Sequence, residues 1–587
     1  MPTISRKQFI RGALGSLMAG QLLGKKAKAQ SAAPNVVFVI ADEWRAQAFG
    51  YAGDRNAHTP AIDRFAAESV NFENAVAGTS VCCPSRACLM TGQYPLTNGV
   101  YINDVPLVPK GVTLGEAFRY AGYDTAYIGK WHLYGSPDGY YGRRLAFIPP
   151  DKRFGFEYWK ANECTHDYNH SIYYGGDDPT PKFWPGYDAI AQTRDACEYI
   201  RKFRDAGTPF FLFLSWGPPH FPLTGAPKRY QDMFKDREIK VRPNVPEVDR
   251  QAAVQDLRGY YAHGAALDDC FDTLLHALED NGKAADTIVV FTSDHGDMMY
   301  SQGLQYKMVP WEESIRIPLL VRYPQALGRE GTRCRELIDS PDIMPTLLGL
   351  SGIQVPKGVQ GTDFSAVMHK PAVEQQRTSS FLSMPVSISS TRHYGIGAYR
   401  GVRTARYTYV RSLHGPWLLY DNVDDPYQQH NLCDRPRMRT VRRDLDDEVS
   451  SWLRKLDDRF MPAEYYLARD GLTHYVEPLV PAGDFVSPWG DWKSTIAIPA
   501  TERPSIDSVI GDLLNDRAAK AVLAGYIPAI LAHPPSGWRE MSLRVLHAYI
   551  PTDFPISRMN AVGAALAKLQ PMTVGSRKVP VAPEDDG

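Results

Sequence analysis

The architecture of this chain is indicated by the stretch Val36-Val37-Phe38-Val39-Ile40-Ala41-Asp42-Glu43, an apolar run that passes directly into two acids. Six consecutive apolar residues, half of them valine, are typical of a strand buried on both faces, as the strands of a parallel sheet are. Both carboxylates would then lie at the C-terminal end of this strand. Open α/β sheets bind their ligands outside that edge.

The same pattern occurs three more times before residue 334. Apolar runs at residues 125–128, 210–214 and 288–291 each lead into reactive polar residues. Taken alone, each run is also explained by a helix cap or a rigid turn. Four of them predict an α/β fold, a large and mainly parallel sheet whose polar strand ends converge at one edge. Segments with helical periodicity that would flank the sheet lie at residues 60–67, 114–121, 189–203 and 254–281. The polar residues are Asp42, Glu43, Lys130, His132, His220, Asp294 and His295.

A second stretch, Ser80-Val81-Cys82-Cys83-Pro84-Ser85-Arg86-Ala87-Cys88-Leu89-Met90-Thr91-Gly92, predicts a loop that turns into a helix. Pro84 suits the first helical position, and Gly92 can end the helix. Cys82 and Cys83 would then lie at the helix N-terminus, where the dipole lowers the pKa of a thiol and attracts anions. Such helix starts also occur where the residues only pack, so both interpretations remain open for this stretch alone.

The whole stretch resembles the signature of the sulfatase family, Cys-x-Pro-Ser-Arg-x-x-x-Leu/Met-Thr-Gly, with Cys82 as its first residue. In that family the cysteine is oxidised to formylglycine, and the hydrate of its aldehyde is the nucleophile. The resemblance implies that Cys82 carries the chemistry, that Cys83 and Cys88 pack, and that a formylglycine-installing enzyme acts on the chain. It also implies an alkaline-phosphatase-like fold.

Three of the strand-end residues match the sulfatase metal site, namely Asp42, Asp294 and His295. Hard divalent cations prefer oxygen ligands, and carboxylates from two strand ends supply them. Glu43 stands where many sulfatases have a second aspartate, which leaves its coordination open. His295 stands where asparagine is common, and a nitrogen ligand makes calcium less certain. The implied cofactor is a divalent ion, Ca²⁺ first with Mg²⁺ or Mn²⁺ as alternatives, held by these four residues and Cys82.

Four more residues match catalytic positions of the family: Lys130, His132, His220 and Lys307. Without the other matches, Lys307 would be read as a solvated surface lysine. By resemblance, Arg86, Lys130 and the metal ion stabilise the charge that shifts within the sulfate group. His220, helped by Lys307, would protonate the leaving alcohol. His132 would take a proton from the hydrate, so that inorganic sulfate is expelled.

Two loops are predicted to face the substrate. Residues 162–170 and 175–186 combine aromatic rings, carboxylates and amides, which suits sugar hydroxyls but is also common in surface turns. His166 in the first loop and Asn103 are the candidate substrate-binding residues. The expected substrate is a sulfated small molecule or glycan, with sulfated carbohydrate preferred.

The start of the chain has the character of an export signal. Basic residues, a short apolar segment and Ala27-Lys28-Ala29 follow one another, and resemble a twin-arginine signal in which Lys7 replaces the second arginine. Residues 1–29 are therefore predicted to direct the chain to the periplasm or the medium, with cleavage favoured over retention as an anchor. No later run of about 18 apolar residues occurs, so stable membrane insertion is not expected.

The overall composition is that of an ordinary globular protein. A formal net charge of -1 gives no reason to expect nucleic acid as a partner, so any anion recognition must be local. Eight cysteines in 587 residues are too few for a disulfide scaffold. Because the chain has no Cys-x-x-Cys pair, a structural zinc site is not expected either.

The chain beyond the predicted catalytic domain, residues 30–334, divides into three parts. Residues 335–466 contain strand patterns followed by a helix, and resemble the smaller antiparallel α+β subdomain of sulfatases. Residues 467–504, rich in Pro, Gly and Trp, predict a linker. Residues 505–587 predict a small helical module with a packing or interaction role, which ends in a frayed acidic tail.

The expected function is an exported sulfatase that hydrolyses a sulfate monoester, preferably on a carbohydrate. Two alternatives remain open at this point. One is a phosphonate or phosphate ester hydrolase of the same superfamily. The other is a sugar-binding protein that keeps the fold without catalysis, against which the intact set Cys82, Arg86, Lys130, His132 and His220 argues.

Overall fold

The computed structural model describes residues 33–135, 144–203, 207–369, 377–388, 391, 394–475, 494–506, 508, 510–532, 543, 546–547 and 553–581. The expected export signal lies outside these ranges, as do residues 476–493 of the expected linker and the acidic tail. Within them, none of the helices combines the length and the hydropathy that crossing a bilayer requires.

The main sheet is mixed and mostly parallel, with the strand order β10-β2-β9-β8-β1-β7-β3-β4-β5-β6. Its strands are β1 (Asn35–Asp42), β2 (Val70–Val76), β3 (Asp124–Lys130), β4 (Tyr158–Asn162), β5 (Ile172–Gly175), β6 (Lys182–Phe183), β7 (Phe210–Pro219), β8 (Thr287–Ser293), β9 (Leu319–Arg322) and β10 (Thr332–Asp339). The four apolar runs found in the sequence form β1, β3, β7 and β8. They lie next to one another as β8-β1-β7-β3, with every pair parallel.

Alternate residues of β1 pack against opposite faces of the sheet. Val37 and Val39 belong to one apolar cluster, whereas Phe38 and Ile40 belong to another. Because both faces are covered, a central strand here has no polar face. This is the physical reason why an uninterrupted apolar run predicted it.

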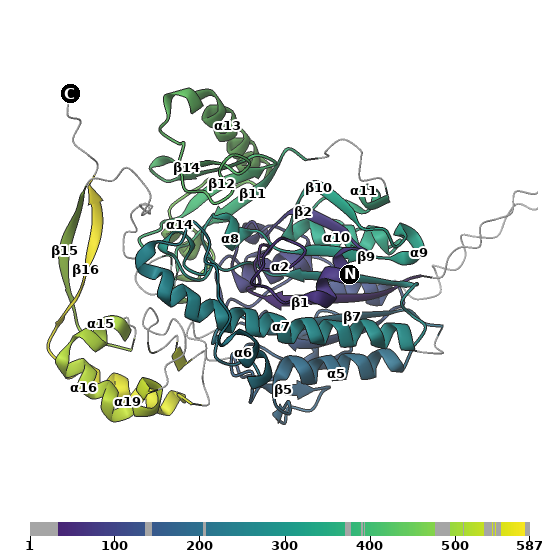
Figure 1. The fold of residues 1–587 in the computed structure, drawn as a ribbon, viewed down its shortest axis with the longest axis horizontal. Coiled ribbons are helices and arrows are strands. Elements are labelled where there is room, and N and C mark those ends of the chain that lie inside the picture. Colours follow the sequence, from purple (N-terminus) through teal and green to yellow (C-terminus); the bar gives the residue numbers. More distant parts are fainter. Residues whose placement is uncertain are drawn as a thin grey trace, which may run out of the picture. The chain divides into compact units, whose positions relative to one another are not determined.

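Helices cover both faces of the sheet. The first cluster is completed by α1 (Pro60–Ala66), α5 (Asp188–Arg201), α6 (Lys228–Phe234) and α7 (Arg250–Asp280). The second is completed by α2 (Cys82–Thr91), α4 (Leu114–Tyr120) and α10 (Ser340–Leu350). Shorter helices are α3 (Pro95–Asn98), α8 (Glu312–Ile315), α9 (Pro324–Leu327) and α11 (Ser365–His369). Figure 1 shows α5 and α7 running side by side along the sheet. The four helical segments expected from the sequence correspond to α1, α4, α5 and α7.

Helix α2 begins two residues earlier than the sequence suggested. Val81 is its extended N-cap, so Pro84 lies within the first turn and not at the first position. The end is as predicted, because Gly92 has a φ of 62° and its N–H donates to the Cys88 carbonyl. A Cβ at Gly92 would lie 2.7 Å from Val359, so only glycine fits there. Every residue of α2 is buried.

A second, antiparallel sheet has the order β11-β12-β13-β14 and packs against α13 (Arg439–Lys455). Its strands are β11 (Ser379–Met384), β12 (Tyr399–Thr404), β13 (Tyr407–Ser412) and β14 (Gly415–Asp421). The predicted fold class, a mainly parallel sheet with a small antiparallel α+β subdomain, is confirmed. The domain boundary expected at residue 334 lies inside β10, which pairs with β2, so the main sheet extends past it.

The remaining described segments are mostly helical. They are α14 (Ala463–Arg469), α15 (Ile510–Asn515), α16 (Arg517–Tyr526), α17 (Pro528–Ala532), α19 (Ile556–Leu566), and the antiparallel pair β15 (Ser494–Glu502) and β16 (Met572–Val581). Strand β15 occupies part of the expected linker, where β-branched residues alternate within a Pro-rich segment. Pro499 falls where the register of the pair shifts, since proline cannot donate to the ladder.

Candidate active site

Four potential metal ligands meet at the C-terminal edge of the main sheet. Asp42 ends β1, Cys82 begins α2, and Asp294 and His295 follow β8. One donor atom of each lies within 4.8 Å of all the others, and all four residues are buried. Their convergence follows from the register, because Ala41 on β1 pairs with Ser293 on β8. The Cys82 Sγ lies 3.8 Å from Asp42 Oδ1 and 3.2 Å from His295 Nε2.

The orientation of the His295 ring is set by its own backbone turn. Its Nδ1 lies 3.0 Å from the Gly296 carbonyl oxygen, which can only accept a hydrogen bond. Nδ1 therefore carries the proton, and the Nε2 lone pair faces the acids, 3.6 Å from an oxygen of Asp42 and of Asp294. A second partner that fixes the tautomer in this way is usual for metal-binding histidines.

Glu43 adds an oxygen that lacks a partner. Its backbone has a φ of 68°, and its carbonyl accepts a 2.8 Å hydrogen bond from the Tyr260 hydroxyl. One carboxylate oxygen accepts from Lys307, whereas the other, Oε1, is buried without a hydrogen bond among the described residues. Burial raises the pKa of the Glu43 carboxyl, although the Lys307 charge opposes this. A buried oxygen of this kind, next to two carboxylates and one imidazole, suits a site for a divalent cation.

Arg86 and Lys130 supply fixed positive charge around these acids. Arg86 Nε donates to Asp294 Oδ2 at 3.0 Å, and its Nη1 donates to the Ser215 hydroxyl at 2.8 Å. Lys130 forms a buried salt bridge with Asp42. Burial alone would raise the pKa of the Asp42 carboxyl, but Lys130 and the other nearby cations hold it well below its usual value. Both cations are therefore held in place without a bound anion.

A second buried cluster joins His220, Lys307 and Glu43. Lys307 Nζ lies 2.6 Å from His220 Nε2 and 2.9 Å from Glu43 Oε2. His220 Nδ1 lies 3.0 Å from the Phe221 carbonyl, so Nδ1 donates and Nε2 accepts from the ammonium. Burial lowers the pKa of His220 to about 4, and the Lys307 charge adds to this. Asp42, Glu43 and His220 also satisfy the geometry of a metal site, but the ammonium already contacts two of them.

His132 follows β3 at the same edge, with a φ of 57°. Its backbone N–H donates to the Glu163 carbonyl at 2.7 Å, and its ring Nε2 lies 3.2 Å from Asp104 Oδ1. The other ring nitrogen, Nδ1, is buried and has no hydrogen bond within the described part of the chain. Burial lowers the pKa of His132 to about 3, and the Lys130 charge adds to this.

The two residues expected to bind substrate lie close to the other predicted site residues. Asn103 Oδ1 accepts a 3.0 Å hydrogen bond from the Cys83 N–H, which satisfies a donor in the first turn of α2. The His166 ring is buried and stacks on His220 at a centroid distance of 4.2 Å. Much of the loop at residues 162–170 is therefore packed inside, whereas residues 176–183 are exposed.

The Cys83 and Cys88 thiols are buried, as the family resemblance implied. Burial raises the pKa of the Cys83 thiol well above its usual value, and the nearby Asp104 carboxylate adds to this. The Cys88 thiol is shifted in the same direction, again by burial first. Loss of hydration thus outweighs the helix dipole at these positions. Both residues belong to packed surroundings.

Residues that hold the site in place were not found from the sequence. Ser215 orients Arg86, and Glu163 supports the loop after β3. Asp104 contacts both His132 and Arg144. Asp104 directly follows the candidate residue Asn103, so the sequence could have indicated that it lies near the site. Nothing in the sequence marked Arg144, because its partner lies 40 residues earlier in the chain.

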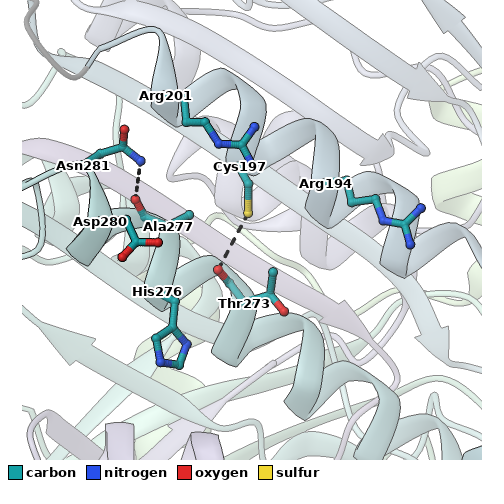
Figure 2. Close-up of a pocket in the computed structure, with 8 residues that line it drawn as sticks. All are labelled: Arg194, Cys197, Arg201, Thr273, His276, Ala277, Asp280 and Asn281. Carbon is teal, nitrogen blue, oxygen red and sulfur yellow. Dashed lines mark hydrogen bonds between the residues drawn. The ribbon is translucent and has the colours of Figure 1, made fainter.

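A groove of about 620 Å³ lies between α5 and α7, away from the residues described above. Figure 2 shows its lining, which is Arg194, Cys197, Arg201, Thr273, His276, Ala277, Asp280 and Asn281. No predicted site residue is among them.

The chain is similar in sequence to known sulfatases. The family model Sulfatase matches residues 34–353, more than half of the chain, and the model N-sulphoglucosamine sulphohydrolase, C-terminal, matches residues 301–455. An ulvan-active sulfatase from Formosa agariphila is 41% identical over 471 residues, which cover 79% of this chain and 90% of the relative. An endo-4-O-sulfatase from Bacteroides thetaiotaomicron is 31% identical over 488 residues, which cover 74% of this chain and 94% of the relative.

The similarity extends to three dimensions. The crystal structure of yidJ from Bacteroides fragilis matches with a TM-score of 0.67 at 28% identity, covering 76% of this chain and 100% of that chain. The residues matched by the family model include Asp42, Cys82 and Asp294, which meet at the edge of the sheet. The chain therefore belongs to the sulfatase family, whose members are sulfuric ester hydrolases.

Proposed function

We propose that this sulfatase hydrolyses a sulfate monoester of a carbohydrate, with residue 82 as the nucleophile after oxidation of Cys82 to formylglycine. The observation that carries the proposal is the buried cluster of Asp42, Cys82, Asp294 and His295. The modified residue would supply a hydrated aldehyde, which is a nucleophile with a second hydroxyl available for release of the product.

A divalent ion is proposed at the same cluster, held by Asp42, Glu43, Asp294, His295 and residue 82. The unpartnered Glu43 Oε1 and the His295 Nε2 lone pair support this assignment. When bound, the ion would supply positive charge for the sulfate oxygens and the nucleophile. A donor set with three carboxylates and one imidazole suits Mg²⁺ or Mn²⁺ as well as Ca²⁺.

Arg86 and Lys130 are proposed to bind the sulfate group. Their buried charges already face Asp42 and Asp294, so little reorganisation is needed when a sulfate arrives. Preorganised cations of this kind stabilise the charge that moves onto the sulfate oxygens in the transition state.

Two separate groups are proposed to move protons. The Lys307–His220 pair, with its 2.6 Å contact, would deliver a proton to the leaving alcohol oxygen. His132 is neutral at physiological pH and would accept a proton through its unpartnered Nδ1. An acid and a base on different strands keep the two transfers apart.

The substrate class is proposed from the relatives and the loops. Of the two similar proteins named above, one is an ulvan-active sulfatase and the other is named an endo-4-O-sulfatase. The exposed stretch at residues 176–183 offers carboxylates, a lysine and an aromatic ring beside the sheet. Such side chains suit sugar hydroxyls.

The test is a comparison of metal-loaded, fully modified enzyme on sulfated polysaccharides, nitrophenyl sulfate, nitrophenyl phosphate and a phenylphosphonate ester. We expect release of inorganic sulfate from at least one polysaccharide, with a kcat/KM above those of the phosphorus esters. The Cys82→Ala variant is the control for contaminating activity. Turnover of phosphorus esters without sulfate release would favour the phosphonate hydrolase alternative.

Export is proposed on the strength of residues 1–29 alone. A periplasmic or secreted location, and a formylglycine-installing enzyme as maturation partner, complete the proposal. Cell fractionation with N-terminal sequencing of the mature chain tests the first point. A mature N-terminus close to residue 30 is expected, and an intact Met1 in the cytoplasmic fraction would contradict it.

A further inference from the structure

Asp104 links a buried cation to the His132 ring. Arg144 donates two hydrogen bonds to the Asp104 carboxylate, from Nε to Oδ1 at 2.9 Å and from Nη2 to Oδ2 at 2.8 Å. The same Oδ1 lies 3.2 Å from His132 Nε2. All three residues are at most 4% exposed. This two-pronged geometry fixes the plane of the carboxylate and, through it, the direction of the acceptor lone pair.

The hydrogen bond determines which ring nitrogen of His132 carries the proton. An ionised carboxylate only accepts hydrogen bonds, and a neutral imidazole has one N–H and one lone pair. Burial alone would raise the pKa of Asp104, but Arg144 and the bond from His132 lower it to about 2, so the carboxylate stays ionised. Nε2 must then be the donor, which leaves Nδ1 with the lone pair.

We propose that Asp104 and Arg144 are positioning residues that hold His132 in its Nε2–H tautomer, so that Nδ1 is the atom that accepts a proton during the reaction. The inference rests on the role of His132 in the proposed function and names the groups that make that role possible. In the step, a reacting hydroxyl loses its O–H bond, Nδ1 gains the proton, and the imidazolium then returns it to solvent. Asp104 stabilises the imidazolium while it exists.

The position of Nδ1 supports this assignment. This nitrogen is buried, and it has no hydrogen bond in the described ranges. A buried nitrogen without a partner is uncommon in a packed protein. The other polar atom of the ring is already committed to Asp104, so this lone pair is available for a ligand.

Arg144 and Asp104 act on the basicity of His132 in opposite directions. The charged groups that face the ring are Lys130, Arg144 and Asp104. Asp104 raises the pKa of His132, whereas burial, Lys130 and Arg144 lower it. Removal of Asp104 therefore shifts the acid limb of the activity profile to lower pH, and removal of Arg144 shifts it to higher pH.

The direct test observes the tautomer in the resting protein. We would label the full chain with ¹⁵N-histidine and assign the His132 ring nitrogens by difference with His132→Gln. The expected wild-type spectrum has a protonated Nε2 and an unprotonated Nδ1. In Asp104→Asn the amide can donate to Nε2, so a second population with a protonated Nδ1 should appear. This readout does not depend on turnover, on the metal ion or on the modification.

The kinetic test separates positioning from folding. We expect Asp104→Asn to lower kcat by about 10²-fold with KM changed less than about threefold, within the range of general acid–base effects. In a His132→Gln background the same substitution should have no further effect on kcat, because a residue that acts through another is silent when that residue is absent. Arg144→Lys keeps one hydrogen bond and should recover part of the loss seen in Arg144→Gln.

The matched control is Asp458→Asn, which breaks the buried pair of Asp458 with Arg400 in the antiparallel subdomain. It should lower the thermal midpoint as the Asp104 variant does, and leave kcat and the His132 nitrogens unchanged. If Asp104→Asn does not fold, the variants Arg144→Lys and Arg144→Gln and the wild-type spectrum still test the proposed positioning of His132.

The inference is overturned if wild-type Nδ1 is protonated, if Asp104→Asn leaves kcat intact, or if the two effects add in the double variant. An active His132→Gln enzyme would instead refute the proposed role of His132. The spectrum would then still report whether Asp104 sets the tautomer, so the two failures are distinguishable.

Discussion

Lys307 Nζ lies 2.6 Å from Nε2 of His220, a direct contact between a buried ammonium and an imidazole. The Nδ1–H of His220 is held by the Phe221 carbonyl, so Nε2 is the nitrogen that accepts from Lys307. The proton that lies between Lys307 Nζ and His220 Nε2 can pass to a substrate oxygen that approaches both nitrogens. The pair is therefore suited to protonating an alkoxide as it leaves.

This contact predicts a dependence on the leaving group. His220→Gln and Lys307→Ala should each lower kcat on a sugar sulfate by about 10²-fold or more, because a sugar alkoxide leaves poorly without a proton. With nitrophenyl sulfate the loss should be several times smaller, since nitrophenolate is a good leaving group. Steady-state kinetics on both substrates test this, and equal losses on the two would contradict it.

Cys82 should be indispensable, and its neighbours should not. Cys82→Ala is expected to lower kcat by about 10⁴-fold or more, as loss of a nucleophile does in other hydrolases. Cys88→Ala, which removes a buried thiol whose pKa is raised by burial, should keep most of the activity with a modest loss of thermal stability. Peptide mass analysis over residue 82 provides the independent readout. A fully active wild-type sample with an unmodified cysteine would contradict the assignment.

Removal of the metal ion should destabilise the protein as well as inactivate it. An ion that binds only the folded state contributes about 2.7 kcal/mol at a concentration 100 times its Kd. Chelation should therefore lower the thermal midpoint, and readdition of the correct ion should restore it. Asp294→Asn should lose both the bound ion and this response. Elemental analysis with Ca²⁺, Mg²⁺ and Mn²⁺ in competition identifies the ion, and one equivalent per chain is expected.

Asp188, the first residue of α5, should make stability depend on pH. Burial raises the pKa of its carboxyl to about 8, against the opposing influence of the nearby Ser171 hydroxyl and the Ala189 N–H. The folded state then binds a proton that the unfolded chain has already released above about pH 4. Stability from this group is present at low pH and is lost as pH rises to about 8, by up to about 1.4 kcal/mol per pH unit. Asp188→Asn should flatten that slope in urea unfolding curves.

The central sheet was predictable because its strands are buried on both faces. The stretch that begins at Val36 contains no polar residue until Asp42, so neither a helical nor a half-exposed strand pattern competes with it. The polar ends of four such strands had to meet once the strands were parallel neighbours. Local patterns thus predicted that these residues meet at one edge, and the family resemblance supplied the roles proposed for them.

The residues that orient this site depend on contacts that local patterns do not encode. Arg144 is recognised only through Asp104, and Glu163 only through the backbone N–H groups of Tyr134 and Gly135. The packing role of Cys83 came from the family resemblance, because the helix dipole is visible in the sequence whereas complete burial is not. Strand β15 was hidden by the proline-rich composition around it.

Complete enclosure of α2 has a consequence for how the enzyme is made. Residue 82 is 2% exposed, and the N–H of its neighbour Cys83 is already occupied by Asn103, so another enzyme has no access to it in the finished protein. The proposed oxidation of this thiol would therefore come before the chain closes around it. On that proposal, molecules that fold first remain inert, and the active fraction of a preparation is decided during synthesis.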